Sequence, residues 1–263
     1  MLTDQDYPFY KLIFLFLVSI FSNVISAISG GGAGLIQLPA LLLFGIPYYQ
    51  ALALHKLATV ALGIGSSLSN FRIYNSDLLI ILILLIIGIP GVLVGSSLVI
   101  IISSEYLYLI IGLLSIILGS YSFTKPDLGL TIKKKNIDFV ILIKFTVLVF
   151  IIGILNGSIS SGTGLLVTIL LIKTFGLDFL KAISITFFCV GIFWNASGAI
   201  ALSQIGGFSL KILIVLLLGS FLGGLLGAHL SKLKGNKIIK RFFTFLCFFV
   251  GFSLCLKFIR GAI

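Results

Sequence analysis

Long runs of apolar residues dominate the chain, and short polar segments separate them. The pattern predicts ten apolar elements, over residues 12–28, 35–44, 51–72, 78–102, 106–123, 138–157, 165–175, 180–203, 208–231 and 238–259. Several of these runs reach the ~20 residues that an α-helix needs to cross the hydrocarbon core of a bilayer. The alternating ~10-residue segments of an outer-membrane barrel are missing. We therefore expect an all-α integral membrane protein.

Two stretches rich in glycine and serine interrupt these runs at corresponding places. Residues 28–34 read Ile-Ser-Gly-Gly-Gly-Ala-Gly, and residues 158–164 read Ser-Ile-Ser-Ser-Gly-Thr-Gly. In lipid each unpaired backbone group costs several kcal/mol, so irregular backbone persists only where protein covers it or where it lines a polar cavity. Paired breaks of this kind indicate a transporter that builds its substrate site from discontinuous helices.

The two halves of the chain carry similar residues in the same order. Placing Gly34 on Gly164 also places Ser66 on Ser197 after a one-residue adjustment, so the spacing is about 130 residues. This spacing indicates an internal duplication and two pseudo-symmetric halves. The predicted division is an N-terminal membrane repeat over residues 1–123, a polar linker over 124–137 and a C-terminal membrane repeat over 138–263.

The distribution of basic residues favours one arrangement of the breaks. If each break lies within a single crossing, nine basic residues fall on one side of the membrane and seven on the other. If each break is the tip of a re-entrant hairpin, the division is twelve against four. The second division fits the positive-inside rule better. It predicts inverted repeats, with about eight transmembrane helices in addition to the broken or re-entrant glycine-rich segments.

Composition narrows the class of protein further. The mean hydropathy is +1.29 and only 10% of the residues are charged. A net charge of +11 could indicate nucleic-acid binding, but the basic residues lie at the ends of predicted helices, so we expect no nucleic-acid partner. Cys189, Cys247 and Cys255 lie in apolar segments without metal-ligand spacing, so no metal or cofactor is expected. The bilayer is the expected partner, and a homo-oligomer is left open.

The glycine-rich tips supply the first group of candidate substrate-binding residues. The free N–H groups at the start of a half-helix, together with the positive end of its dipole, form an anion site. The candidates are Gly30, Gly31, Gly32, Gly34, Ser160, Ser161, Gly162, Thr163 and Gly164. A nucleotide-binding loop is disfavoured, because no strand precedes the glycines and no Gly-Lys-Ser/Thr follows. The structural alternative is that the glycines only let helices pack closely.

A polar stripe inside the apolar segment 51–72 supplies the second group. The candidates are His55, Lys56, Thr59, Ser66 and Asn70, together with Asn195 of the second half. A lysine at membrane depth is costly, so Lys56 is a functional candidate that could attract an anion, unless its side chain snorkels to the nearby interface. His55 could carry a proton, or it could be a hydrogen-bonded structural residue.

Three motifs together resemble one transporter family. They are Gly30-Gly31-Gly32-Ala33-Gly34-Leu35-Ile36-Gln37-Leu38-Pro39, the turn Gly45-Ile46-Pro47 and Ala51-Leu52-Ala53-Leu54-His55-Lys56-Leu57. These motifs resemble those of the TauE/SafE family of sulfite exporters, also called the 4-toluene sulfonate uptake permease family. Ser160-Ser161-Gly162-Thr163-Gly164 looks like a degenerate copy of the first motif. The resemblance covers nearly the whole chain. It implies a secondary transporter of the cytoplasmic membrane for sulfite, sulfonates or related small organic anions.

We therefore expect a multi-pass anion transporter that works by alternating access between its two repeats. A membrane-embedded enzyme is disfavoured, because catalysis would need clustered His, Cys, Asp or Glu side chains. A non-transporting scaffold subunit would be expected to carry long polar loops, whereas the longest predicted loop has about thirteen residues.

Overall fold

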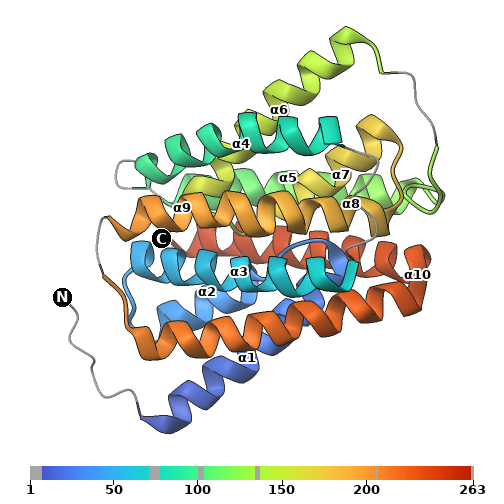
Figure 1. Cartoon of the computed structure of the whole chain (residues 1–263). Helices are drawn as coiled ribbons and strands as arrows, with labels where there is room; N and C mark the ends of the chain where they lie inside the picture. Colours follow the sequence, from blue (N-terminus) through green and yellow to red (C-terminus); the bar gives the residue numbers. More distant parts are fainter. Residues whose placement is uncertain (1–7, 71–77, 100–103, 134–136, 205–206, 262–263) are drawn as a thin grey trace.

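The computed structural model describes residues 8–70, 78–99, 104–133, 137–204 and 207–261. All regular structure in these ranges is helical, which confirms the predicted all-α fold. The elements are α1 (Phe9–Ser29), α2 (Gly34–Leu43), α3 (Tyr48–Asn70), α4 (Leu78–Leu98), α5 (Ser104–Thr124), α6 (Phe139–Ser158), α7 (Thr163–Phe175), α8 (Phe179–Thr186), the π-helix η2 (Phe187–Trp194), α9 (Asn195–Ser203) and α10 (Leu210–Gly261). Most helices lie lengthwise beside one another in a bundle (Figure 1).

Six stretches of the described chain are long and apolar enough to cross a membrane. They are α1, α4, α6, α10, residues 48–69 of α3 and the continuous run from α8 through α9. Within α10, Gly235 has a non-helical backbone, with φ of 72° and ψ of 171°. The helix doubles back there (Figure 1), and each limb exceeds the ~20 residues of one crossing. The total of eight crossings stays a prediction.

Each glycine-rich break turns the chain back on itself. The ring of Phe44, just beyond α2, lies 5.8 Å from the ring of Phe14 near the start of α1, measured between centroids. In the second half the rings of Phe145 in α6 and Phe175 at the end of α7 lie 4.8 Å apart. Because the first helix of each pair meets the end of the second, α1–α2 and α6–α7 are helical hairpins with the breaks at their tips.

The two hairpins open towards opposite ends of the bundle (Figure 1). The open end of α1–α2 packs in one apolar cluster with Leu202 of α9 and Ile212 of α10. The open end of α6–α7 instead joins the linker, because Lys133 N donates to Gly176 O at 2.8 Å. This arrangement supports inverted repeats, while the duplication itself and its division at residues 124–137 stay predictions.

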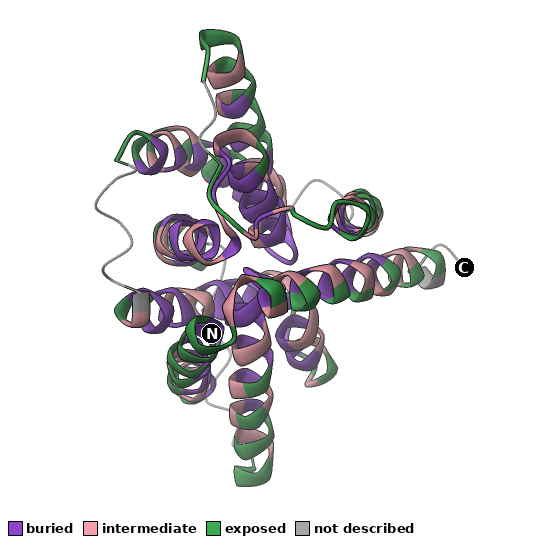
Figure 2. Ribbon diagram, turned by 90° about the vertical axis from the view of Figure 1, so that its right-hand side faces the viewer, coloured by how far each residue is buried: buried purple, intermediate pink, exposed green. Residues whose placement is uncertain are grey.

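Small residues bring the helices into close contact at the centre of the bundle. Buried residues face inward and exposed ones line the outer faces (Figure 2). Along α4 and α6, a Cβ added at Gly91 would lie 2.5 Å from Phe150 O, and one at Gly153 would lie 2.6 Å from Gly88 O. Such close backbone approach is typical of helix packing in membranes. Large apolar side chains such as Leu17 and Ile86 remain exposed on the outer faces and contact the bilayer.

Candidate functional site

The two glycine-rich tips meet at the centre of the molecule, backbone against backbone. A Cβ added at Gly31 would lie 2.8 Å from Leu165 N, and one at Gly164 would lie 2.9 Å from Gly30 O. Thr168 Oγ1 of α7 donates a hydrogen bond to Gly30 O at 3.2 Å. Gly31 has φ of +150°, a value that side chains disfavour. The sequence can therefore make this contact only with glycine at the first tip.

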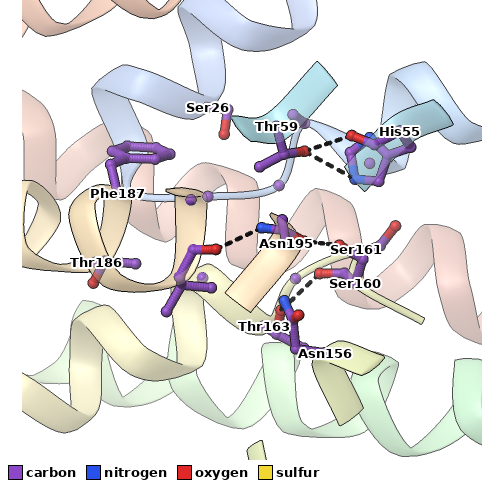
Figure 3. A pocket seen from close by; sticks show the side chains of 18 residues that line it. Ser26, His55, Thr59, Asn156, Ser160, Ser161, Thr163, Thr186, Phe187 and Asn195 are labelled. Atoms are coloured by element: carbon purple, nitrogen blue, oxygen red, sulfur yellow. Dashed lines mark hydrogen bonds between the residues drawn. The ribbon is translucent and has the colours of Figure 1, made fainter. Parts of the chain in front are cut away.

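A small buried cavity lies where the tips meet (Figure 3). The space open to the centre of a water-sized sphere is about 30 Å³. Most of the candidate residues line it: Gly31, Gly32, Gly34, His55, Thr59, Ser160, Ser161, Gly162, Thr163, Gly164 and Asn195. The cavity thus brings together residues from both tips, from α3 and from the junction of η2 with α9.

Unpaired hydrogen-bond donors surround the cavity. In the described part of the chain, no group accepts a hydrogen bond from the backbone N–H of any of five lining residues: Gly32, Ala33, Gly34, Gly162 and Gly164. The hydroxyls of Ser26 and Ser161 likewise have no partner among the described residues, although both side chains are buried. No carboxylate lines the described cavity. A wall of donors without acidic groups suits an anion.

Lys56 lies behind this wall rather than in it. Its side chain is fully buried, and Nζ donates to Asn156 O at 2.7 Å and to Asn156 Oδ1 at 3.2 Å. A longer contact of 3.5 Å reaches Asn195 Oδ1. Both asparagines line the cavity. Lys56 therefore does not snorkel to an interface. Its ammonium group lies behind the side chains of Asn156 and Asn195, which separate it from the cavity.

His55 faces the cavity and is held from behind by Gln37. His55 Nδ1 lies 2.8 Å from Gln37 Oε1. Because an amide oxygen only accepts hydrogen bonds, Nδ1 must carry the hydrogen. Nε2 faces Thr59, whose Oγ1 lies 3.5 Å away. Gln37 Nε2 in turn donates to Ser19 Oγ at 3.0 Å. The role of His55 as a proton carrier stays a prediction.

Three other candidates lie outside the cavity lining. Gly30 accepts from Thr168 through its carbonyl and donates its N–H to Ser26 O at 2.8 Å. Ser66 is buried away from the cavity, and its hydroxyl has no hydrogen-bond partner in the described chain. The side chain of Asn70 lies outside the described residues.

Sequence reasoning missed several lining residues, and a π-helix is one cause. Thr186, Phe187, Val190 and Gly191 reach the cavity from the end of α8 and from η2. Asn195 Nδ2 donates to Val190 O at 2.7 Å, five positions earlier. A π-helix often marks a functional segment, but it has no signature in the apolar pattern.

The other lining residues that sequence reasoning missed could have been found by comparing the two halves of the chain. Ser26, Ala33 and Asn156 also line the cavity. Asn156 is the counterpart of Ser26 at the repeat spacing of about 130 residues. The counterparts Gly34 and Gly164 both line the cavity as well. The pairing of lining residues supports a pseudo-symmetric site.

A pair of interior contacts repeats in the same way. His55 and Gln37 are 18 positions apart and in contact. Thr186 and Thr168, each 131 positions later in the sequence, are also 18 positions apart, with hydroxyl oxygens separated by 3.1 Å. Each contact holds the start of the second long helix of a half against the short helix that follows the tip.

Comparisons with known proteins agree on one family. The family described as "Sulfite exporter TauE/SafE" matches residues 15–254. A Sinorhizobium protein named "Probable membrane transporter protein ORF9" is 32% identical over 90% of this chain and 89% of its own length. A Haemophilus influenzae protein named "Probable membrane transporter protein" is 31% identical over 87% of this chain and 88% of its own.

A third relative and the solved structures complete the comparison. The Escherichia coli K12 protein named "Probable membrane transporter protein YfcA" is 27% identical over 86% of this chain and 82% of its own length. No solved structure matches the chain. The family match spans nearly all of the apolar helices, and the relatives' names describe transporters rather than enzymes. The chain is thus a multi-pass membrane protein that belongs to the TauE/SafE sulfite exporter family of membrane transporters.

Proposed function

We propose that the protein is a secondary transporter of small anions in the cytoplasmic membrane and binds its anion in the cavity between the two tips. The observation that carries this proposal is the set of unpaired N–H groups from both tips around a cavity without a carboxylate. An anion bound there would accept hydrogen bonds from these N–H groups, for which no described protein group is an acceptor. The positive ends of the α2 and α7 dipoles would add to the attraction.

The charge of Lys56 strengthens the proposal. Isolating a charge from water costs several kcal/mol unless hydrogen bonds and an opposite charge compensate it. Asn156 and Asn195 supply oxygens to Lys56 Nζ, and no salt bridge to it occurs among the described residues. An anion bound in the cavity would supply the opposite charge, on the far side of the two asparagine side chains from Lys56.

The size of the cavity supports a mechanism in which the two halves of the protein move relative to each other. A buried water needs at least ~10–15 Å³ measured in this way, so the cavity holds about two water molecules and no whole organic anion. The tips must separate before a sulfite or a sulfonate head group can enter. Because the two hairpins open towards opposite ends of the bundle, rocking of one half against the other would expose the site to each side in turn.

The substrate class follows from the site and the family together. Sulfite and sulfonate head groups present three oxygens that accept hydrogen bonds and carry a negative charge, which matches a site made of donors. Related small organic anions present two acceptor oxygens and a negative charge on a carboxylate. Sulfite and short sulfonates such as taurine or isethionate are therefore the first substrates to test.

Thermal unfolding of the purified protein in the presence of single anions tests the binding step. A ligand at 100 times its dissociation constant adds about 2.7 kcal/mol of stability. We expect stabilisation by one sulfur oxyanion or sulfonate, measured against chloride at equal ionic strength, and uptake of that anion into proteoliposomes. Stabilisation by none of sulfite, sulfate, thiosulfate, taurine or isethionate would remove the proposed site.

A further inference from the structure

A second cavity of about 460 Å³ lies at the surface, far along the chain from the tips. The end of α5 and the linker form one wall, with Phe123 and Leu130. The second limb of α10 forms the other, with Lys237, Arg241 and Phe245. Nothing in the transport mechanism proposed above uses this groove.

The groove changes from cationic to aromatic along its length. Lys237, Lys240 and Arg241 follow directly after the turn at Gly235, whereas Phe245 and Phe248 lie one to two helical turns further along. At 1.5 Å per residue, Lys237 and Phe248 are about 16 Å apart along the helix. The aromatic part remains open, since Phe123 is 75% exposed and Phe245 is 64% exposed.

The cationic end of the groove is free to bind a ligand. Lys237 and Arg241 are exposed and have no hydrogen-bond or ion-pair partner among the described residues. Lys240 instead donates to the carbonyls of Lys125 and Pro126, which fixes the linker as a wall. No carboxylate lines the described part of the groove, and Asp127 lies in the neighbouring cavity.

We propose that this groove binds an anionic phospholipid. The phosphate of the head group pairs with Lys237 and Arg241, and an acyl chain lies along Phe123, Phe245 and Phe248. The order of charges and rings along α10 matches the order of head group and tail in a lipid. A soluble anion would use only the cationic end and would leave the exposed rings uncovered.

The position in the bundle fits this ligand. The groove lies at the linker end, where the predicted topology gathers twelve of the sixteen basic loop residues and therefore places the cytoplasm. The cytoplasmic leaflet is the one rich in anionic lipids, and basic clusters beside membrane helices attract their head groups. The lipid site does not depend on which anion the tips bind.

Native mass spectrometry of the full chain in detergent tests the proposal, with phosphatidylglycerol and phosphatidylcholine of the same acyl chains. We expect tighter binding of phosphatidylglycerol. The double variant Lys237→Gln, Arg241→Gln should reduce that preference roughly tenfold or more, since it removes both charged donors that pair with the phosphate in the groove. The control Lys232→Gln, Lys234→Gln removes the same charge from exposed positions outside the groove and should leave the preference unchanged.

Further arms separate a lipid from a free phosphate. Phe245→Ser should weaken phosphatidylglycerol binding, whereas Phe242→Ser, an exposed phenylalanine outside the groove, should not. Glycerol 3-phosphate should bind far more weakly than the lipid. Equal binding of the two lipids, equal losses in both double variants, or binding of glycerol 3-phosphate as tight as that of the lipid would overturn the proposal. Thermal unfolding of every variant checks that it is folded.

Discussion

Lys56 and Asn156 join the two halves of the molecule directly. Lys56 Nζ, from α3, donates to the backbone carbonyl of Asn156 at 2.7 Å and to its side-chain oxygen at 3.2 Å. Asn156 lies in the last turn of α6, where unpaired carbonyls and the negative end of the dipole favour a cation. The lysine of the first half thus braces the tip of the second.

Replacing Lys56 by methionine should weaken anion binding by roughly tenfold or more, because the positive charge behind the cavity would no longer attract the bound anion. The variant removes the buried charge and leaves both Asn156 oxygens without their donor. Anion-dependent thermal shifts, measured over a range of anion concentrations, give the dissociation constant.

Lys144→Met is the matched control for this variant. Lys144 is an exposed lysine of α6 and does not line the cavity, so its loss changes the net charge equally without touching the site. Unaltered anion affinity in a folded Lys56→Met, or an equal loss in Lys144→Met, would show that Lys56 does not act on the bound anion.

Gly31→Ala should prevent the tips from meeting. The added Cβ would lie 2.8 Å from Leu165 N, and overpacking of this kind costs ~1–3 kcal/mol in addition to backbone strain at φ of +150°. We expect a lower midpoint of thermal unfolding and loss of anion-dependent stabilisation.

Gly45→Ala separates the two causes in the Gly31 variant. Gly45 also has a positive φ, of +75°, but no atom lies within 4 Å of the added Cβ. It should show only the backbone cost of ~1–2 kcal/mol. If both variants lose the same stability and both keep anion binding, the contact between the tips is not needed.

The glycine-rich tips were predictable because few sequences place consecutive glycines inside an apolar run. The hairpins followed from the excess of basic residues on one side. The partners of Lys56 were not predictable, since Asn156 is 100 positions away and a helical stripe shows which face is polar but not what it meets. Nor did the apolar pattern reveal η2, because a π-helix shifts the register by one residue within a segment that is apolar all round.

Gly91→Ala should destabilise the protein, although alanine is the better helix former by ~1 kcal/mol. The added Cβ would lie 2.5 Å from Phe150 O of α6, so α4 and α6 would have to separate. We expect the overpacking cost of ~1–3 kcal/mol to exceed that gain, measured as a lower unfolding midpoint in detergent. Gly207→Ala has no atom within 4 Å of the added Cβ and should change the midpoint little. A midpoint raised by Gly91→Ala would mean that the helices are free to move apart.

Gln37→Leu should release His55 from its present position. Gln37 Oε1 is the acceptor for His55 Nδ1, and leucine would leave that buried N–H unpaired at a cost of ~1–3 kcal/mol. The buried Gln50 provides a matched control, because its Oε1 already has no partner in the described chain. Among the described residues its side chain makes one long hydrogen bond, from Nε2 to the hydroxyl of Tyr49 at 3.4 Å. Removing a buried group that is already unpaired is close to neutral or stabilising.

The two glutamine variants are compared by thermal unfolding with and without the anion that stabilises the wild type. Gln37→Leu should lower both the midpoint and the anion-dependent shift, because the His55 ring then turns away from the cavity. Gln50→Leu should lower neither the unfolding midpoint nor the anion-dependent shift. A fall in stability of the same size in both variants, with the anion shift intact in both, would show that the hydrogen bond from His55 to Gln37 stabilises packing only and does not position His55 for the anion.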